Sequence, residues 1–271
     1  MSDTSITWNA YLAKGVPPRK RVFVGGNWKC NGTIKDVNAL ISALNLMTIP
    51  LTSEVVLAVP SIYLSLAKAQ FRAEVAVSSQ DASFFGNGAY TGETSAPMLA
   101  DMGVRWTLVG HSERRIGFGF PGETSEVCAA KTKRALDAGV SVIFCIGESL
   151  AERESGKTLD VCAAQLKPLL ALNLDSAVWR KSIVIAYEPV WAIGTGKVAT
   201  PQQAEQTHLE IRQHLNNCAL GAASKDVRII YGGSVKGSNC KELIGGPNID
   251  GFLVGGASLL PEFQDIIKCS V

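Results

Sequence analysis

The chain has 271 residues, of which 46% are hydrophobic and 18% are charged, and its formal net charge is +2. This length and apolar content allow one large domain, or two small ones, with a well-filled core. A net charge so close to zero gives no field that would gather nucleic acid, and no apolar run reaches the roughly 18 residues of a membrane span. We therefore expect neither a nucleic-acid nor a membrane partner.

The seven cysteines are scattered along the chain. They form no C-x-x-C pair and no Cys/His cluster with zinc spacing, so we expect no metal site. Secreted disulfide frameworks have a different pattern, which favours reduced thiols in a reducing compartment, here the cytoplasm.

Residues 1–18 do not share the repeating pattern of the rest and lack the apolar core of a secretory signal. We interpret them as a disordered arm or a remnant of cloning, with a short targeting segment as the alternative. Residues 19–271 then form a single domain.

Eight short apolar runs, rich in β-branched residues and bounded by Gly, Pro or Asn, predict β-strands. The runs are residues 22–24, 55–59, 75–77, 106–109, 140–144, 183–186, 227–230 and 251–254. Most of them are separated by helical patterns, such as the helix expected from Pro201 with Thr200 as its N-cap. Alternating strands and helices favour a parallel sheet, and eight such units in one α/β domain predict a closed (β/α)8 barrel.

A doubly wound open sheet is the structural alternative, but it places its ligand at one switch point. Here polar residues follow several strands, as the carboxyl-terminal rim of a barrel requires. Asn27 and Lys29 follow the first strand, and we expect both to point to one side if the alternation continues. A lysine there offers a positive charge to a phosphate or an oxyanion; a capping Asn and a solvated Lys are the alternative.

His111 follows the fourth strand, and Ser112-Glu113 look like the first turn of a helix. The positive end of a helix dipole opposes imidazolium, so a neutral imidazole that donates N–H to a carbonyl is expected. His208 and His214 lie on a predicted helix away from strand ends, and we interpret both as structural.

Glu188 follows the sixth strand and precedes a connection with stiff ends and a glycine-containing centre. Such a segment suits a lid that moves on a few dihedrals and shields the carboxylate from water. The glycine-rich ends of the last two strands, Gly232-Gly233-Ser234 and Gly255-Gly256, offer backbone N–H groups to a phosphate.

These segments, in this order and at these separations, resemble the triosephosphate isomerase family from about Arg21 to Lys268. The matching motifs are Gly25-Gly26-Asn27-Trp28-Lys29, residues 109–115 (Val-Gly-His-Ser-Glu-Arg-Arg), residues 186–195, Tyr231-Gly232-Gly233-Ser234-Val235 and Gly255-Gly256-Ala257-Ser258-Leu259. The resemblance implies an enzyme of glycolysis and gluconeogenesis that interconverts dihydroxyacetone phosphate and D-glyceraldehyde 3-phosphate through an enediolate, without a metal or an organic cofactor.

The resemblance also implies residue roles. Glu188 would be the catalytic base, His111 and Lys29 would stabilise the enediolate, Asn27 would position substrate, and Glu113 would contact the lysine.

The phosphate-binding positions implied by the resemblance are Gly194, Ser234, Gly255 and Gly256, and residues 189–199 would be the closing lid.

The resemblance further implies a homodimer, in which the third loop of one subunit brings Thr91 near the active site of the other and packs around Cys30. This loop departs from the family pattern, because Asp81 replaces the usual Asn and Phe84-Phe85 make it more apolar. A catalytically silent barrel and another barrel enzyme acting on a phosphosugar are the alternative functions.

Overall fold

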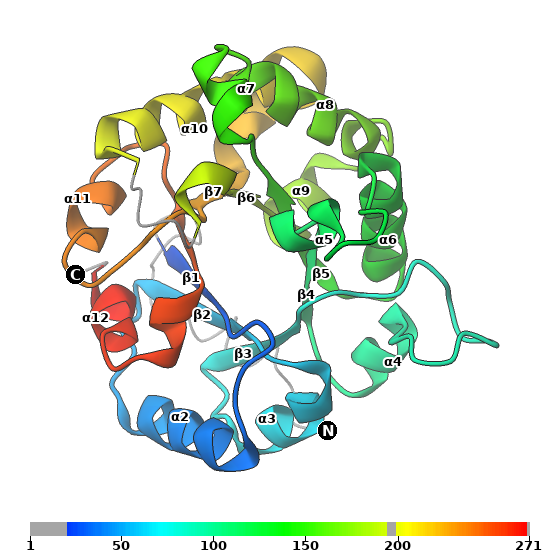
Figure 1. Ribbon diagram of the computed structural model, residues 1–271, viewed down its shortest axis with the longest axis vertical. Helices are drawn as coiled ribbons and strands as arrows, with labels where there is room; N and C mark the ends of the chain where they lie inside the picture. Colours follow the sequence, from blue (N-terminus) through cyan, green and yellow to red (C-terminus); the bar gives the residue numbers. More distant parts are fainter. Residues whose placement is uncertain (1–20, 194–198, 270–271) are drawn as a thin grey trace.

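Eight parallel strands pair in chain order, and the last also pairs with the first, so that the sheet closes into a barrel (Figure 1). The computed structural model describes residues 21–193 and 199–269. The strands are β1 (Val22–Asn27), β2 (Ser53–Ala58), β3 (Val75–Ser79), β4 (Trp106–Val109), β5 (Ser141–Ile146), β6 (Ile183–Tyr187), β7 (Arg228–Tyr231) and β8 (Gly251–Val254). The prediction of an eight-stranded (β/α)8 barrel is confirmed.

Helices surround the barrel as an outer ring, with at least one in every connection between consecutive strands (Figure 1). The α-helices are α2 (Ile34–Leu46), α3 (Leu64–Gln70), α4 (Ala96–Asp101), α5 (Ser112–Ile116), α6 (Ser125–Asp137), α7 (Leu150–Glu154), α8 (Thr158–Leu170), α9 (Ser176–Ser182), α10 (Pro201–Leu215), α11 (Cys240–Ile244) and α12 (Phe263–Lys268). Short helical turns are η2 (Ser61–Tyr63), η3 (Val190–Ala192), η4 (Asn216–Leu220), η5 (Gly221–Asp226) and η6 (Gly256–Leu259). Within the described ranges, every helix is too short or too polar to serve as a membrane span.

Alternation along the strands divides the buried apolar residues between two cores. In β2, Val55 and Leu57 join the large cluster that packs against the helices, whereas Val56 and Ala58 join a smaller cluster. The smaller cluster, which fills the barrel interior, also contains Phe23, Trp106, Leu108, Ile143, Cys145, Val184, Ala186, Ile230 and Leu253. The strands are therefore buried on both faces, which explains their continuous apolar runs.

The amino-terminal end of the barrel is closed by an aromatic and charged layer. The guanidinium of Arg228 lies 5.2 Å from the ring centre of Phe23 and 5.4 Å from that of Trp106. It also donates to Glu54 Oε2 at 2.9 Å. These contacts are cation–π and charge-assisted interactions of a partly desolvated arginine, so this end is built for stability.

Capping residues determine where the helices near the site begin, and so help to position the site residues. Thr200 caps α10 through a reciprocal pair of hydrogen bonds with Gln203, at 3.0 and 3.1 Å, and Pro201 occupies the first helical position as predicted. His111 is the N-cap of α5, which confirms the helical turn expected after it. Both caps lie on the side of the barrel where the strands end.

Candidate active site

A cavity of about 430 Å³ opens at the carboxyl ends of the strands. Side chains from the ends of three strands, β1, β4 and β6, meet in it: Asn27, Lys29, His111 and Glu188. The sequence placed these residues up to 161 positions apart, and closure of the barrel brings them together.

Lys29 has a backbone conformation that a lysine rarely adopts. Its φ of +52° lies in the left-handed region, and two hydrogen bonds hold it there. Its N–H donates to Asn27 Oδ1 at 2.9 Å, and its carbonyl accepts from Gln80 Nε2 at 2.8 Å. Both Asn27 and Lys29 do line the cavity, but the strand ends at Asn27, so strand alternation is not the reason.

The ammonium of Lys29 is oriented by Glu113. Lys29 Nζ donates to Glu113 Oε1 at 2.6 Å, and the two side chains are 26% and 41% exposed. Side chains this exposed form an ion pair that water screens. The pair therefore orients the lysine more than it stabilises the fold.

His111 bridges the helix start and the carboxylate. Its Nδ1 accepts from the Glu113 backbone N–H at 3.3 Å, so this nitrogen must carry a lone pair. Its Nε2 lies 3.2 Å from Glu188 Oε1. This arrangement is that of a neutral imidazole with its proton on Nε2, where it can be donated into the cavity.

Glu188 is only 2% exposed, and its backbone is held by the neighbouring strand. Its N–H donates to the Ile146 carbonyl at 2.7 Å, and its Oε2 accepts from the Ser112 N–H at 3.1 Å. Two glycines make room for it. A Cβ on Gly147 would lie 1.7 Å from the Glu188 carbonyl oxygen, and one on Gly232 would lie 2.8 Å from Glu188 Cγ.

Glu148 is a residue that the sequence reasoning missed. It is fully buried after β5, and its Oε1 accepts from Tyr187 Oη at 3.0 Å, Trp191 Nε1 at 3.0 Å and Arg153 Nη1 at 3.2 Å. Trp191 begins the connection after Glu188, so this carboxylate fixes the start of the expected lid. A polar residue directly after an apolar run was the signal that could have revealed it.

The glycine-rich ends of β7 and β8 form one wall of the same cavity. Gly232, Gly233 and Ser234 line it together with Gly255 and Gly256. Gly194 lies outside the described residues, as do residues 195–198 of the predicted lid.

Cys30 and Thr91 are both exposed and do not line the cavity of their own chain. Cys145, by contrast, is fully buried in β5, and burial, reinforced by the Glu188 charge, raises the pKa of its thiol.

The fold and the site define the class of protein: a (β/α)8-barrel enzyme with a buried carboxylate, an imidazole and an ammonium group in one cavity beside glycine-rich turns. Such a set can move a proton and stabilise an anionic intermediate.

Comparison with known proteins gives the family. The triosephosphate isomerase family model matches residues 22–270. The chain is 51% identical over 251 residues to the triosephosphate isomerase of Paracoccidioides lutzii, covering 93% of this chain and 98% of that protein. It is 52% identical to the enzyme of Aspergillus oryzae, covering 92% and 98% respectively, and 49% identical to the cytosolic enzyme of Oryza sativa, covering 92% and 96%.

The chain belongs to the triosephosphate isomerase family, and it is an enzyme that interconverts dihydroxyacetone phosphate and D-glyceraldehyde 3-phosphate. The silent barrel and the other phosphosugar enzyme, which the sequence left open, are thereby set aside.

Proposed function

We propose that Glu188 is the base of this isomerisation, with His111 and Lys29 as the groups that stabilise the enediolate. The observation that carries the proposal is the 3.2 Å contact between His111 Nε2 and Glu188 Oε1 inside the cavity that Lys29 also lines. A proton donor and a proton acceptor there face the same small volume, while the ammonium supplies positive charge.

In the proposed step, Glu188 removes a proton from the carbon next to the substrate carbonyl, and the proton returns at the neighbouring carbon. The Nε2–H of His111 and the ammonium of Lys29 donate to the oxygens on which negative charge develops. Asn27 positions substrate, and Glu113 holds the lysine in place. Because Glu188 Oε2 rests on the Ser112 N–H, the carboxylate exchanges this contact for the substrate carbon.

The phosphate is proposed to bind the turns after β7 and β8, through backbone N–H groups at Ser234, Gly255 and Gly256, with Gly194 of the lid completing the site. Closure of residues 189–199 would exclude water and keep the enediolate from losing its phosphate.

Replacing Lys29 tests the charge in this proposal. Lys29→Ala should lower kcat and raise KM together, because the ammonium would contact both phosphate and enediolate. The unfolding midpoint should stay near that of the wild type, since the side chain is partly exposed. Lys35→Ala, at an exposed position on α2, is the matched control. Full activity in Lys29→Ala, or its unfolding, would assign the lysine a structural role.

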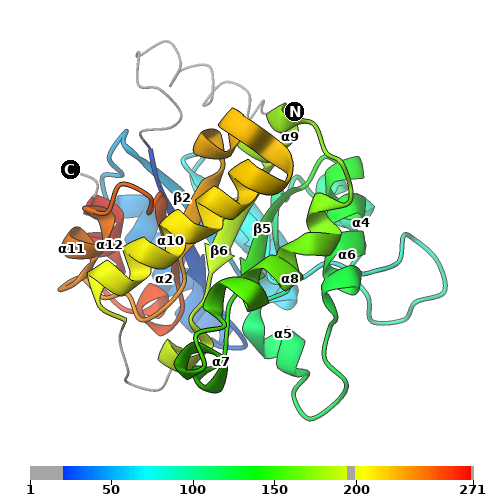
Figure 2. The same ribbon diagram turned by 90° about the horizontal axis from the view of Figure 1, so that it is seen from above.

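We further propose a homodimer built through the loop between β3 and α4, which extends away from the barrel (Figure 2). Phe84, Phe85 and Tyr90 of this loop are 37–42% exposed, and the Phe85 and Tyr90 rings stack at 4.1 Å. An apolar, stacked loop in solvent is typical of an interaction surface. In the proposed dimer Thr91 lies beside the partner's active site.

Asp81 anchors the base of this loop to the barrel. Its Oδ2 accepts from Lys131 Nζ at 2.7 Å and lies 2.9 Å from Arg114 Nε. Burial raises the pKa of this carboxyl even so. The replacement of the usual Asn thus adds a charge to the cluster that already contains Glu123.

The dimer proposal predicts sedimentation at about twice the chain mass of 28.8 kDa. A small thiol reagent should convert the protein to inactive monomers, because an adduct on Cys30 does not fit an interface packed to core density. Cys30→Ser, treated in parallel, should keep its activity and its dimer mass. If both proteins lose activity equally, Cys30 is not the interface thiol.

A cytoplasmic location is proposed as well. It is supported by seven unpaired cysteines and by the printed name of the cytosolic rice relative.

A further inference from the structure

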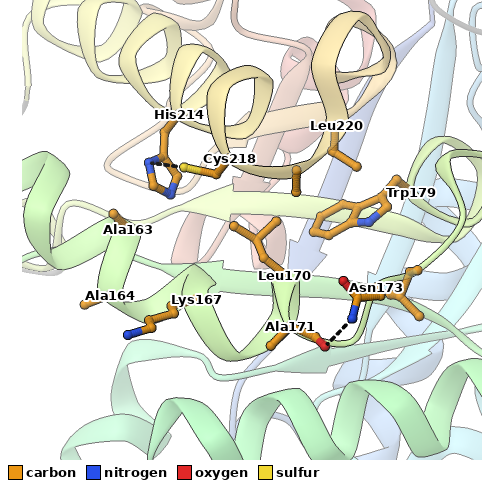
Figure 3. Close-up of a pocket in the computed structure, with 12 residues that line it drawn as sticks. Ala163, Ala164, Lys167, Leu170, Ala171, Asn173, Trp179, His214, Cys218 and Leu220 are labelled. Atoms are coloured by element: carbon orange, nitrogen blue, oxygen red, sulfur yellow. Dashed lines mark hydrogen bonds between the residues drawn. The ribbon is translucent and has the colours of Figure 1, made fainter.

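A second cavity lies away from the catalytic side chains. Its volume is about 830 Å³, and it is bordered by α8, α9, the end of α10 and η4 (Figure 3). α9 leads directly into the amino end of β6, and η4 and η5 lead into that of β7. The cavity therefore lies toward the end of the barrel opposite to Glu188, and the proposed catalysis leaves it unused.

The walls of this cavity are mostly apolar. Its apolar lining includes Ala163, Leu170, Ala171, Leu174 and Leu220. Trp179 also lines it and is 2% exposed. A space of 300–1,000 Å³ with apolar walls and a few polar groups is typical of a small-molecule site.

A thiol and an imidazole meet in the same cavity. Cys218 Sγ lies 3.6 Å from His214 Nδ1, and the pair is one helical turn apart (Figure 3). Cys218 belongs to the single π-helical turn η4, a rare structure that is frequent at functional sites. His214 lies in the last turn of α10, directly before η4. A proton transfer from thiol to imidazole is therefore supported by the position of both groups.

The other cysteines lack this combination. Burial raises the pKa of five thiols, those of Cys128, Cys145, Cys162, Cys240 and Cys269. Cys30 is exposed, but it lines neither cavity. Cys218 is exposed, has a neighbouring base and borders an apolar space, which are the features of a reactive cysteine with a binding site of its own.

We propose that this cavity binds apolar α,β-unsaturated carbonyl compounds and that Cys218 adds to them. The apolar part of the ligand would occupy the walls around Leu170, and a carbonyl oxygen would accept from the Trp179 indole N–H. In the addition, the Cys218 S–H bond breaks and its proton passes to His214 Nδ1. An S–C bond forms at the β-carbon, the π electrons move to the α-carbon, and that carbon takes up a proton. The product is a thioether, and no oxidant or reductant takes part.

Two maleimides with the same reactive ring test the proposal. N-cyclohexylmaleimide carries an apolar ring, whereas N-methylmaleimide does not. All proteins in this test carry Cys30→Ser, so that the maleimides leave the dimer and its activity intact. Adduct formation at Cys218 is followed by mass spectrometry of peptides from this protein, and each rate is divided by the rate with free glutathione. We expect at least a roughly tenfold preference for the cyclohexyl compound, because burial of its ring favours binding, and a rate that saturates with its concentration.

Three variants separate the parts of the site. Leu170→Ser should abolish the preference while keeping the thiol reactive. His214→Gln should lower both rates roughly tenfold or more while keeping the preference, because only the base is lost. Cys218→Ser should form no adduct at this peptide and should keep wild-type isomerase activity. If Leu170→Ser does not fold, the concentration dependence in the Cys30→Ser protein decides. A linear dependence with no preference beyond that of glutathione would overturn the proposal.

Discussion

The chemistry of Glu188 depends on where the backbone holds it. A carboxylate that is 2% exposed loses most of its water, and two neutral donors, the Ser112 N–H and His111 Nε2–H, replace part of it. Neutral donors compensate a buried charge less completely than a cation does. Lys29, which lines the same cavity, directs its ammonium at Glu113 instead.

Shortening this side chain should be costly. Glu188→Asp keeps the charge but retracts the carboxylate by one methylene, which is a misplacement of about 1 Å. We expect kcat to fall by on the order of 10²-fold or more, with a smaller change in KM. Steady-state kinetics with both triose phosphates would measure the effect. Activity close to that of the wild type would remove Glu188 from the role of base.

At the scale of residues, sequence reasoning found the groups with distinctive chemistry. Lys29, His111 and Glu188 each follow an apolar run, and barrel closure gathers strand ends by necessity. It gave the wrong reason for the orientation of Lys29. The left-handed φ of this lysine is held by a hydrogen bond from its N–H to Asn27 Oδ1 and by one from the distant Gln80 to its carbonyl, and strand alternation predicts neither. Sequence reasoning interpreted His214 as structural, and the structure places Cys218 Sγ 3.6 Å from His214 Nδ1, one helical turn away.

At the scale of elements, hydrogen bonds join the residues after β5 to the first residues of the proposed lid. Glu148 accepts three hydrogen bonds through one oxygen, while its other oxygen, Oε2, is buried without a partner among the described residues. The guanidinium of Arg153 also lies 5.2 Å from the Trp191 ring centre. An acceptor shared by a tyrosine, a tryptophan and an arginine holds the first residues of the proposed lid to the rigid barrel.

Removing the charge of Glu148 should loosen this connection without touching the substrate cavity. Glu148→Gln keeps one acceptor oxygen but weakens the charge-assisted bond to Arg153. We expect kcat/KM to fall by about tenfold, which corresponds to about 1.4 kcal/mol. Glu154→Gln, on the exposed face of α7, is the control and should behave as wild type. Equal kinetics in the two variants would separate Glu148 from lid movement.

The elements themselves were largely predictable, because the strands are buried on both faces and give continuous apolar runs. The ends of the elements were less predictable. β1 extends three residues beyond its apolar run, to Asn27, since Gly25 and Gly26 pair with β2 and β8 through backbone groups alone. No apolar signal marks such residues.

At the scale of the whole molecule, the barrel has two ends with different tasks. The amino end is filled by Arg228 and its aromatic neighbours, and the carboxyl end keeps an open cavity of about 430 Å³. Between the two ends, α10 packs against β6 and β7, and its residue His208 is fully buried there. Its Nδ1 lies 2.7 Å from the Ala204 carbonyl, and burial lowers the pKa of this imidazole to about 4.

His208 should make the fold sensitive to acid. The unfolded state takes up its proton near pH 6.5 and the folded state only near pH 4, so stability is full above pH 6.5 and falls as the pH drops toward 4. The loss through this residue should be about 3 kcal/mol. Urea unfolding between pH 7 and pH 4 would measure it.

The matched variant for this measurement is His208→Gln, which should be less stable at neutral pH but should lack this part of the pH dependence. Burial raises the pKa of Asp81 and Asp250, but these carboxyls are present in both proteins and cancel in the difference. Parallel pH profiles for the two proteins would show that His208 does not titrate as described.

The central claim is that a carboxylate in this cavity isomerises triose phosphates by proton transfer through an enediolate. The most direct measurement incubates the purified protein with D-glyceraldehyde 3-phosphate in D2O and follows the products by proton NMR. We predict rapid formation of dihydroxyacetone phosphate, part of it carrying deuterium, because a proton held on Glu188 can exchange with solvent. Absence of dihydroxyacetone phosphate, or a product that never contains deuterium, would contradict the account.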